Sequence, residues 1–292
     1  MSLDENPLII AFVGDLYFTS RIESVAQNLG FRVSWFDRAE QLMNVVPGTS
    51  DPRSLEHPAG QKPDVLDYIT LYHPALILFD LNNNEVPWRD WIILIKTSPA
   101  TRRIPVVCFG SHMDVAAMKA ARAAGAEAVV ARSKFVKSLD ELILKYARRI
   151  DFIALRDACR QPLSETALHG LELFNRGEYF EAHEVLEAAW NLDDSPAKEL
   201  YRAVLQVAVT YYQIERGNYR GVMKMFLRLR QWIDPLPDEC RGVNVAQLRQ
   251  DMLRVREAVI ALGPGQISEF NRSLFRPVVF TKEIDRNLNE LQ

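Results

Sequence analysis

A short run of polar side chains at residues 179–187 has the residue types of a metal or acid–base site. His183 and Glu187 are four residues apart, so they are neighbours on one face of a helix. A histidine beside glutamates can bind a metal ion or transfer a proton, and Glu184 adds a second carboxylate. The second histidine of an H-E-x-x-H zinc helix is missing, and His169 is the only other histidine beyond residue 150. A metal-dependent hydrolase is one hypothesis for this segment.

The same side chains fit a second interpretation, a polar network within a helical core. In that arrangement, Arg202 or Gln206 on a facing helix pairs with His183 and the glutamates. Buried polar groups need such partners, and the partners also fix the register between two helices. We favour this structural interpretation over catalysis.

Two further carboxylates, Asp15 and Asp80, each follow a short apolar run in the first half of the chain. Five such runs alternate with helical patterns, at 8–13, 31–36, 75–79, 104–109 and 128–131. Apolar strands separated by amphipathic helices predict an α/β fold with a doubly wound, five-stranded parallel sheet. Ligands bind at the carboxyl ends of the strands in such sheets, so we expect Asp15 and Asp80 at one edge.

Residues 7–148 resemble the receiver domain of two-component response regulators. The resemblance rests on PALILFDL at 74–81, RIPVVCFG at 103–110 and AAGAEAVVARSK at 123–134. In that family an aspartate after strand three accepts a phosphoryl group beside a magnesium ion. The resemblance implies that Asp80 is the phosphoacceptor and that the backbone carbonyl of Asn82 helps to hold the metal. It also implies a histidine kinase or another protein partner, and homodimerisation.

Three positions depart from the family pattern. The acidic pair after strand one is reduced to Asp15, so a magnesium site would rest on Asp15 and Asp80. A glycine fills the position of the phosphate-binding hydroxyl, with Ser111 one residue later. Arg132 stands at the position of the phosphate-binding lysine, and Lys134 follows two residues on. These departures favour a pseudo-receiver, which keeps the fold for docking or dimerisation.

The two halves are joined without an obvious linker. Neither glycine nor proline occurs at 138–160, and a helical apolar stripe continues through this segment. The stripe predicts either one continuous helix, a rigid rod between two domains, or two helices broken near Asp151. We divide the chain into a receiver-like domain at 1–148, a connecting helix at 149–162 and an all-helical domain at 163–292. The segment 47–63, with four prolines, is expected to form an exposed loop.

Helical patterns without a strand signal fill the second half. They predict helices at 165–175, 179–192, 197–216, 219–233 and 245–262. The segment FNRGEYFEAHEVLEAAW at 174–190, VLQVAV at 204–209 and the RGN turn at 216–218 resemble the domain-of-unknown-function family 309. The resemblance covers residues 163–262 and implies a helical bundle with no assigned reaction. The site candidates of this domain are Tyr179, His183, Glu184, Glu187, Gln206 and Asn218.

A row of basic residues follows the second turn of this motif. Arg216, Arg220, Lys224 and Arg228 recur at four-residue steps, with Arg230 beside them. Arginine suits phosphate and carboxylate groups, so RNA or another anion is a weaker alternative. A solvated face paired with glutamates is preferred, because the chain beyond residue 150 has 18 basic and 21 acidic residues. Nucleic acid is not an expected partner.

Composition limits the class of protein further. Apolar residues make up 48% and charged residues 25% of the 292 residues, as in soluble globular proteins. No apolar run of the sequence is long enough for a membrane span. Cys108, Cys159 and Cys240 are odd in number and widely spaced, which predicts reduced thiols and a cytoplasmic location. We expect a non-enzymatic signalling protein that couples a degenerate receiver to a helical interaction domain.

Overall fold

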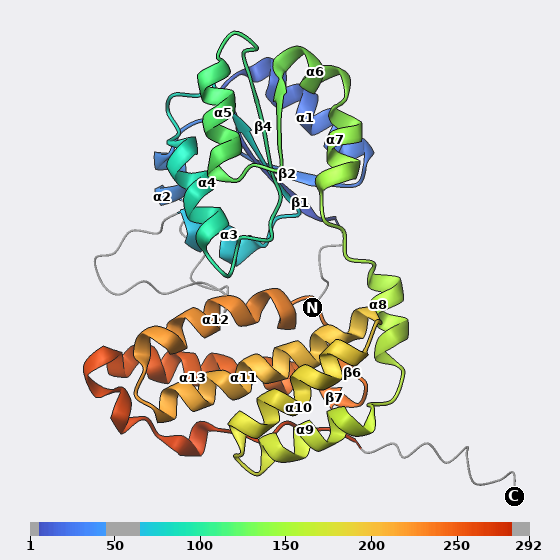
Figure 1. Cartoon of the computed structure of the whole chain (residues 1–292), viewed down its shortest axis with the longest axis vertical. Coiled ribbons are helices and arrows are strands. Elements are labelled where there is room, and N and C mark those ends of the chain that lie inside the picture. Colours follow the sequence, from blue (N-terminus) through green and yellow to red (C-terminus); the bar gives the residue numbers. More distant parts are fainter. Residues whose placement is uncertain (1–5, 45–64, 282–292) are drawn as a thin grey trace, which may run out of the picture. The chain divides into compact units, whose positions relative to one another are not determined.

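The chain forms two compact units, Met1–Arg149 and Ile150–Gln292 (Figure 1). The computed structural model describes residues 6–44 and 65–281, so the predicted loop at 47–63 lies outside the described residues. Separate clusters of buried apolar side chains fill the two units. Each unit is therefore described by itself.

The first unit contains the predicted five-stranded parallel sheet. Its strands are β1 Leu8–Phe12, β2 Arg32–Phe36, β3 Leu76–Asp80, β4 Val106–Gly110 and β5 Ala128–Ala131. They pair in the order β2-β1-β3-β4-β5, and every pairing is parallel. All residues of β1, β3 and β4 are buried, as the near-continuous apolar runs predict. This strand order is that of the flavodoxin-like fold, which receiver domains share, and it confirms the predicted fold class.

Alternate side chains of the central strands point to opposite faces of the sheet. Ile10 and Phe12 of β1 belong to one core, and Ile9 and Ala11 belong to the other. The first core is covered by α3 Val65–Tyr72, α4 Trp88–Thr97 and α5 Val115–Ala124. The second is covered by α1 Leu16–Asn28, α6 Arg132–Lys137 and α7 Leu139–Tyr146. A further short helix, α2, spans Glu40–Asn44.

The segment that joins the two units is not a continuous helix. Helix α7 ends at Tyr146, and the next helix, α8, spans only Phe152–Cys159. At the break, the backbone N–H of Arg148 donates to the carbonyl of Ala75 at 2.9 Å, a tertiary contact with the residue before β3. The Asp151 side chain then accepts from the backbone of Ala154 and caps α8. The rigid rod is therefore wrong, and the alternative of two helices is confirmed.

The second unit is helical, as predicted. Its main helices are α9 Glu165–Asn175, α10 Tyr179–Leu192, α11 Glu199–Glu215, α12 Tyr219–Ile233 and α13 Val245–Gln266. Short 3₁₀ turns lie at Pro196–Lys198, Ile267–Glu269 and Arg272–Leu274. Helix α11 is the central helix, since 11 of its 17 residues are buried. Gly177 and Gly217 end α9 and α11 with positive φ angles of 80° and 67°, which glycine adopts without strain.

Two features of this unit differ from the sequence predictions. A hairpin of β6 Glu239–Cys240 and β7 Val243–Asn244 precedes α13, and its two-residue strands are too short to give a periodic signal. Cys240 of this hairpin forms a disulfide with Cys159 of α8. The prediction of reduced thiols is therefore wrong for these two cysteines. It failed because 81 residues separate them in sequence while their Cα atoms lie 4.4 Å apart.

Candidate functional site

Asp80 ends β3 at the carboxyl edge of the sheet, and its side chain is buried with an exposed fraction of 3%. Each carboxylate oxygen has its own partner. Oδ1 accepts the backbone N–H of Asn82 at 3.0 Å, and Oδ2 forms an ion pair with Nη2 of Arg132 at 2.7 Å. The Arg132 guanidinium also lies 5.1 Å from the centre of the Phe18 ring. The position expected to hold a lysine therefore supplies the counter-charge of Asp80 through arginine.

Asn82 and Ser111 lie together at the same edge. The side-chain carbonyl of Asn82 accepts the backbone N–H of Ser111 at 2.9 Å, which ties the loop after β3 to the loop after β4. The Ser111 hydroxyl accepts the backbone N–H of Met113 at 3.3 Å, so it shapes its own loop. The structure thus brings Asp80, Asn82, Ser111 and Arg132 into one network.

Asp15 and Lys134 have other structural surroundings. The exposed carboxylate of Asp15 caps α1, since it accepts the backbone N–H of Tyr17 at 2.9 Å. Lys134 is an exposed residue of α6, and its carbonyl accepts the hydroxyl of Ser138. The hydrogen bonds and the ion pair of the Asp80 carboxylate go to Asn82 and Arg132, and neither Asp15 nor Lys134 takes part in them.

The donor set at this edge is poor for a magnesium ion. Magnesium sites use one or two carboxylates and several waters, and they need free carboxylate oxygens. Both oxygens of Asp80 are already engaged, and one of them holds a cation. Within residues 6–44 and 65–281, no group of three or more His, Cys, Asp or Glu side chains could hold a metal ion. In this arrangement Asp80 offers no free carboxylate oxygen to a magnesium ion.

In the helical unit, three of the six candidate residues line one cavity of about 250 Å³. His183 and Glu187 come from α10, and Gln206 comes from α11. The rest of the lining consists of Trp190, Arg202, Leu205, Val209, Met225 and Arg228. The Arg202 guanidinium carbon lies 4.1 Å from the ring centre of Trp190 and 4.0 Å from that of Trp232. Helices α10, α11 and α12 thus build a polar cavity around a stacked arginine.

The other three candidates lie outside this cavity, and two of them, Tyr179 and Asn218, serve the packing and capping of the helices. The Tyr179 ring packs edge-on against Phe174 and Tyr211, and burial raises the pKa of Tyr179 to about 12. Asn218 caps α12 by accepting the backbone N–H of Gly221 at 3.0 Å. Glu184 is exposed and does not line the cavity.

Two polar residues of the cavity, Trp190 and Arg228, were not predicted to lie beside His183. Trp190 lies seven residues after His183, and extending the helical period by two turns would have found it. Arg228 was assigned to a solvated stripe, but it lines the cavity from α12. The place of Arg228 in a cavity with residues of α10 and α11 leaves no signal in the sequence around it. The pattern of α12 alone therefore does not predict that Arg228 lines the cavity.

The basic row at 216–230, which begins at the end of α11 and continues on α12, is divided among several roles. Arg216 donates to the Tyr212 hydroxyl at 2.8 Å, and Arg230 pairs with Asp234 at 3.1 Å. Arg220 and Lys224 are exposed, whereas Arg228 lines the cavity. These residues do not form one continuous basic surface.

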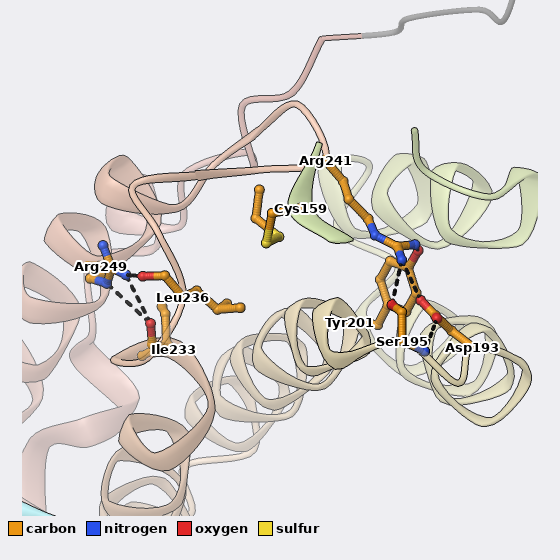
Figure 2. The surroundings of a disulfide bond; sticks show 9 residues. Cys159, Asp193, Ser195, Tyr201, Ile233, Leu236, Arg241 and Arg249 are labelled. Carbon is orange, nitrogen blue, oxygen red and sulfur yellow. Dashed lines mark hydrogen bonds and ion pairs between the residues drawn. A yellow bond between two sulfur atoms is a disulfide. The ribbon is translucent and has the colours of Figure 1, made fainter. Parts of the chain in front are cut away.

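Figure 2 shows the disulfide and, near it, Arg241 with its side chain directed toward Tyr201, Ser195 and Asp193. Arg241, in the turn of the β6–β7 hairpin, donates to the Ser195 and Tyr201 hydroxyls and pairs with Asp193 at 2.9 Å. Its φ of 52° is unusual for a residue other than glycine. Its backbone N–H donates to the carbonyl of Cys159 at 2.6 Å. A cavity of about 370 Å³ is lined by Arg156, Arg160 and Arg241 together with Cys159.

Comparison with known families identifies part of the helical unit. Residues 167–225 match a family described as a domain of unknown function, DUF309. An uncharacterized protein of Aquifex aeolicus (strain VF5) is 27% identical over 77 residues. That match covers 26% of this chain and 23% of the relative, so the chain spans about a quarter of the relative's length.

The first unit is similar to solved receiver structures. The phosphorylated cyanobacterial phytochrome response regulator RcpA is 16% identical, with a TM-score of 0.36, over 48% of this chain and 94% of its own. The receiver domain of the histidine kinase PA1611 from Pseudomonas aeruginosa PAO1, with magnesium in its active-site cleft, is 13% identical, with a TM-score of 0.37, over 48% and 97%. A receiver domain from Rhodospirillum rubrum is 21% identical, with a TM-score of 0.35, over 48% and 92%.

The sheet topology and the family match each describe one of the two units. The chain joins a unit with the receiver fold to a helical unit. That helical unit carries the DUF309 segment at residues 167–225. Within the described ranges, no helix is long and apolar enough to cross a membrane.

Proposed function

We propose that this chain is a signal-transduction protein whose first unit is a pseudo-receiver. The observation that carries the proposal is the ion pair between Asp80 and Arg132 at 2.7 Å. A phosphoacceptor carboxylate needs a free oxygen for attack and a cation that neutralises the transferred group. Both Asp80 oxygens are engaged, and the cation is a fixed guanidinium, so the aspartate supports the fold instead of accepting phosphate.

A protein partner then supplies the input in place of a phosphoryl group. Several apolar side chains of the first unit are exposed, among them Ile93 and Leu94 of α4 and Leu144 of α7. Ile93 and Leu94 are adjacent on α4, and exposed apolar side chains that lie together favour a protein contact. A histidine kinase, another signalling protein or a second copy of the chain fits this role, and the helical unit is the output module.

The metal-dependent hydrolase is not favoured by the site geometry. Glu184 lies outside the cavity that contains His183 and Glu187. No metal-binding cluster of three acidic, histidine or cysteine residues is found in the part of the chain that the structure describes.

The pseudo-receiver is tested by phosphorylation with acetyl phosphate and magnesium, followed by a phosphate-affinity gel. The wild type should show no labelling above that of Asp80→Asn. The variant Gly14→Asp/Arg132→Lys restores an acidic pair and a lysine, and it should gain labelling. A Cβ atom at Gly14 would lie 3.7 Å from the Asn83 amide, so the substitution fits. Labelling of the wild type that disappears in Asp80→Asn would contradict the proposal.

A further inference from the structure

We propose that the cavity between α10, α11 and α12 binds a small oxyanion, a phosphate or a carboxylate, that also carries a hydroxyl donor. The cavity measures about 250 Å³ and is lined by helices of the unit that carries the DUF309 segment. Its polar lining is formed by His183, Glu187, Trp190, Arg202, Gln206 and Arg228.

Two buried polar atoms of uncharged side chains in this lining lack a hydrogen-bond partner within the described residues. One is the side-chain carbonyl Oε1 of Gln206, a residue with an exposed fraction of 7%. The other is the indole N–H of Trp190. Buried polar groups are almost always satisfied by protein, water or ligand. The cavity therefore presents one acceptor and one donor to whatever occupies it.

The charge of the lining favours an anion. Arg202 and Arg228 contribute two guanidinium groups to the lining, and the exposed Glu187 contributes its one carboxylate. Glu199, which does not line the cavity, lies 3.7 Å from Nη1 of Arg202, and a guanidinium has several N–H donors besides those of one nitrogen. Stacking between Trp190 and Trp232 fixes the plane of the Arg202 guanidinium, so that little entropy is lost when a ligand binds. Planar guanidinium groups match the paired oxygens of a carboxylate or phosphate.

The free acceptor on Gln206 sets the specificity within this class. A hydroxyl group of the ligand can donate to the Gln206 carbonyl, while the anionic oxygens accept from Trp190 and the arginines. Phosphate at neutral pH keeps an O–H group, whereas sulfate has acceptors only. Glycolate differs from acetate in the same way. Phosphate should bind more tightly than sulfate, and glycolate more tightly than acetate.

The test is a titration of the full chain with inorganic phosphate, followed through the indole N–H signals in NMR spectra. Trp190→Phe assigns the Trp190 signal among the five tryptophans. Saturable movement of this signal is expected. Arg228→Gln should weaken binding about tenfold, the loss of one charge-assisted hydrogen bond. Arg220→Gln, on the same helix but exposed and outside the cavity, should leave it unchanged.

Glycolate, acetate and sulfate complete the experiment. Tighter binding of phosphate than of glycolate identifies a phosphate ligand, and the reverse identifies a hydroxy acid. Gln206→Leu keeps the size of the side chain and should abolish the preference for phosphate over sulfate, which tests the site if Arg228→Gln does not fold. Absence of a saturable shift with both phosphate and glycolate would overturn the proposal. Equal effects of Arg228→Gln and Arg220→Gln would overturn it as well.

Discussion

The carboxylate of Asp80 is held by two different groups, one for each oxygen. The backbone of Asn82 and the guanidinium of Arg132 are these partners, and the guanidinium also packs over Phe18. A buried carboxylate is costly unless it is paired and hydrogen-bonded. In the proposed pseudo-receiver, Asp80 is therefore a structural anion that fixes the loops at the edge of the sheet.

The pairing gives a prediction about stability. Arg132→Gln should lower the free energy of unfolding by about 1–3 kcal/mol, because it leaves the buried Asp80 carboxylate without its counter-charge. The double variant Asp80→Asn/Arg132→Gln should lose less than the two single variants added together. Urea unfolding of the four proteins at neutral pH measures the coupling. Strictly additive losses would mean that the ion pair contributes nothing.

Part of this network could be predicted from residue types and spacing. Asp80 and Asn82 follow a buried strand, so the pattern places them at the sheet edge. His183 and Glu187 share a helix face, which the four-residue spacing indicates. The partners of these residues come from distant segments, as in the case of Arg132, which is 52 residues from Asp80. Residue types alone do not specify such contacts.

Helices α9 and α10, which lie mostly within the segment that matches DUF309, approach each other closely. Gly170 of α9 faces Leu186 of α10, and a Cβ atom at Gly170 would lie 2.7 Å from Cγ of Leu186. Leu186 is fully buried, so its side chain has no room to move aside. The absence of a side chain at Gly170 therefore sets the distance between α9 and α10.

This contact predicts the effect of one added methyl group. Gly170→Ala should destabilise the chain by about 1–3 kcal/mol through overpacking, despite the better helix propensity of alanine. Gly265→Ala is the matched control, since a Cβ atom there would meet nothing within 4 Å. Thermal unfolding by circular dichroism compares the two. A Gly170→Ala variant as stable as the wild type would show that the helices can separate without cost.

The sequence pattern predicts most strands and helices of the chain. It does not predict the break after Tyr146 or the short β6–β7 hairpin. Apolar runs and helical periods located the five strands of the sheet and the five main helices of the second unit. The break after Tyr146 coincides with a hydrogen bond from Arg148 to Ala75, a tertiary contact that leaves the helical pattern intact. The β6–β7 hairpin has two-residue strands, and it is held by the contacts of Arg241 instead of by a repeating pattern.

Over the molecule as a whole, each unit has its own hydrophobic core, and the two units are stabilised by different interactions. The first unit relies on a sheet covered on both faces. The second adds the Cys159–Cys240 disulfide, which joins α8 to the hairpin before α13. The disulfide closes a loop with a sequence separation of 81 residues, and long loops gain the most from closure in the chain-entropy model.

Breaking this disulfide should selectively destabilise the helical unit. Cys159→Ala/Cys240→Ala should cost about 4 kcal/mol and lower its melting temperature by roughly 10 °C. Reductant should lower the melting temperature of the wild type to that of the variant and leave the variant unchanged. A wild type that melts at the same temperature with and without reductant would contradict the prediction. Buried Cys108 stays outside this exchange, because burial raises the pKa of its thiol.

The same disulfide changes what a cut in the backbone does. Helices α9 to α12 all lie between Cys159 and Cys240, inside a covalent ring. A protease that cleaves once anywhere in this ring opens a circle and releases no fragment. The two pieces of a helical unit cleaved once in this ring stay covalently joined while the disulfide is intact. They separate only when the disulfide is reduced, so the outcome of proteolysis depends on redox conditions.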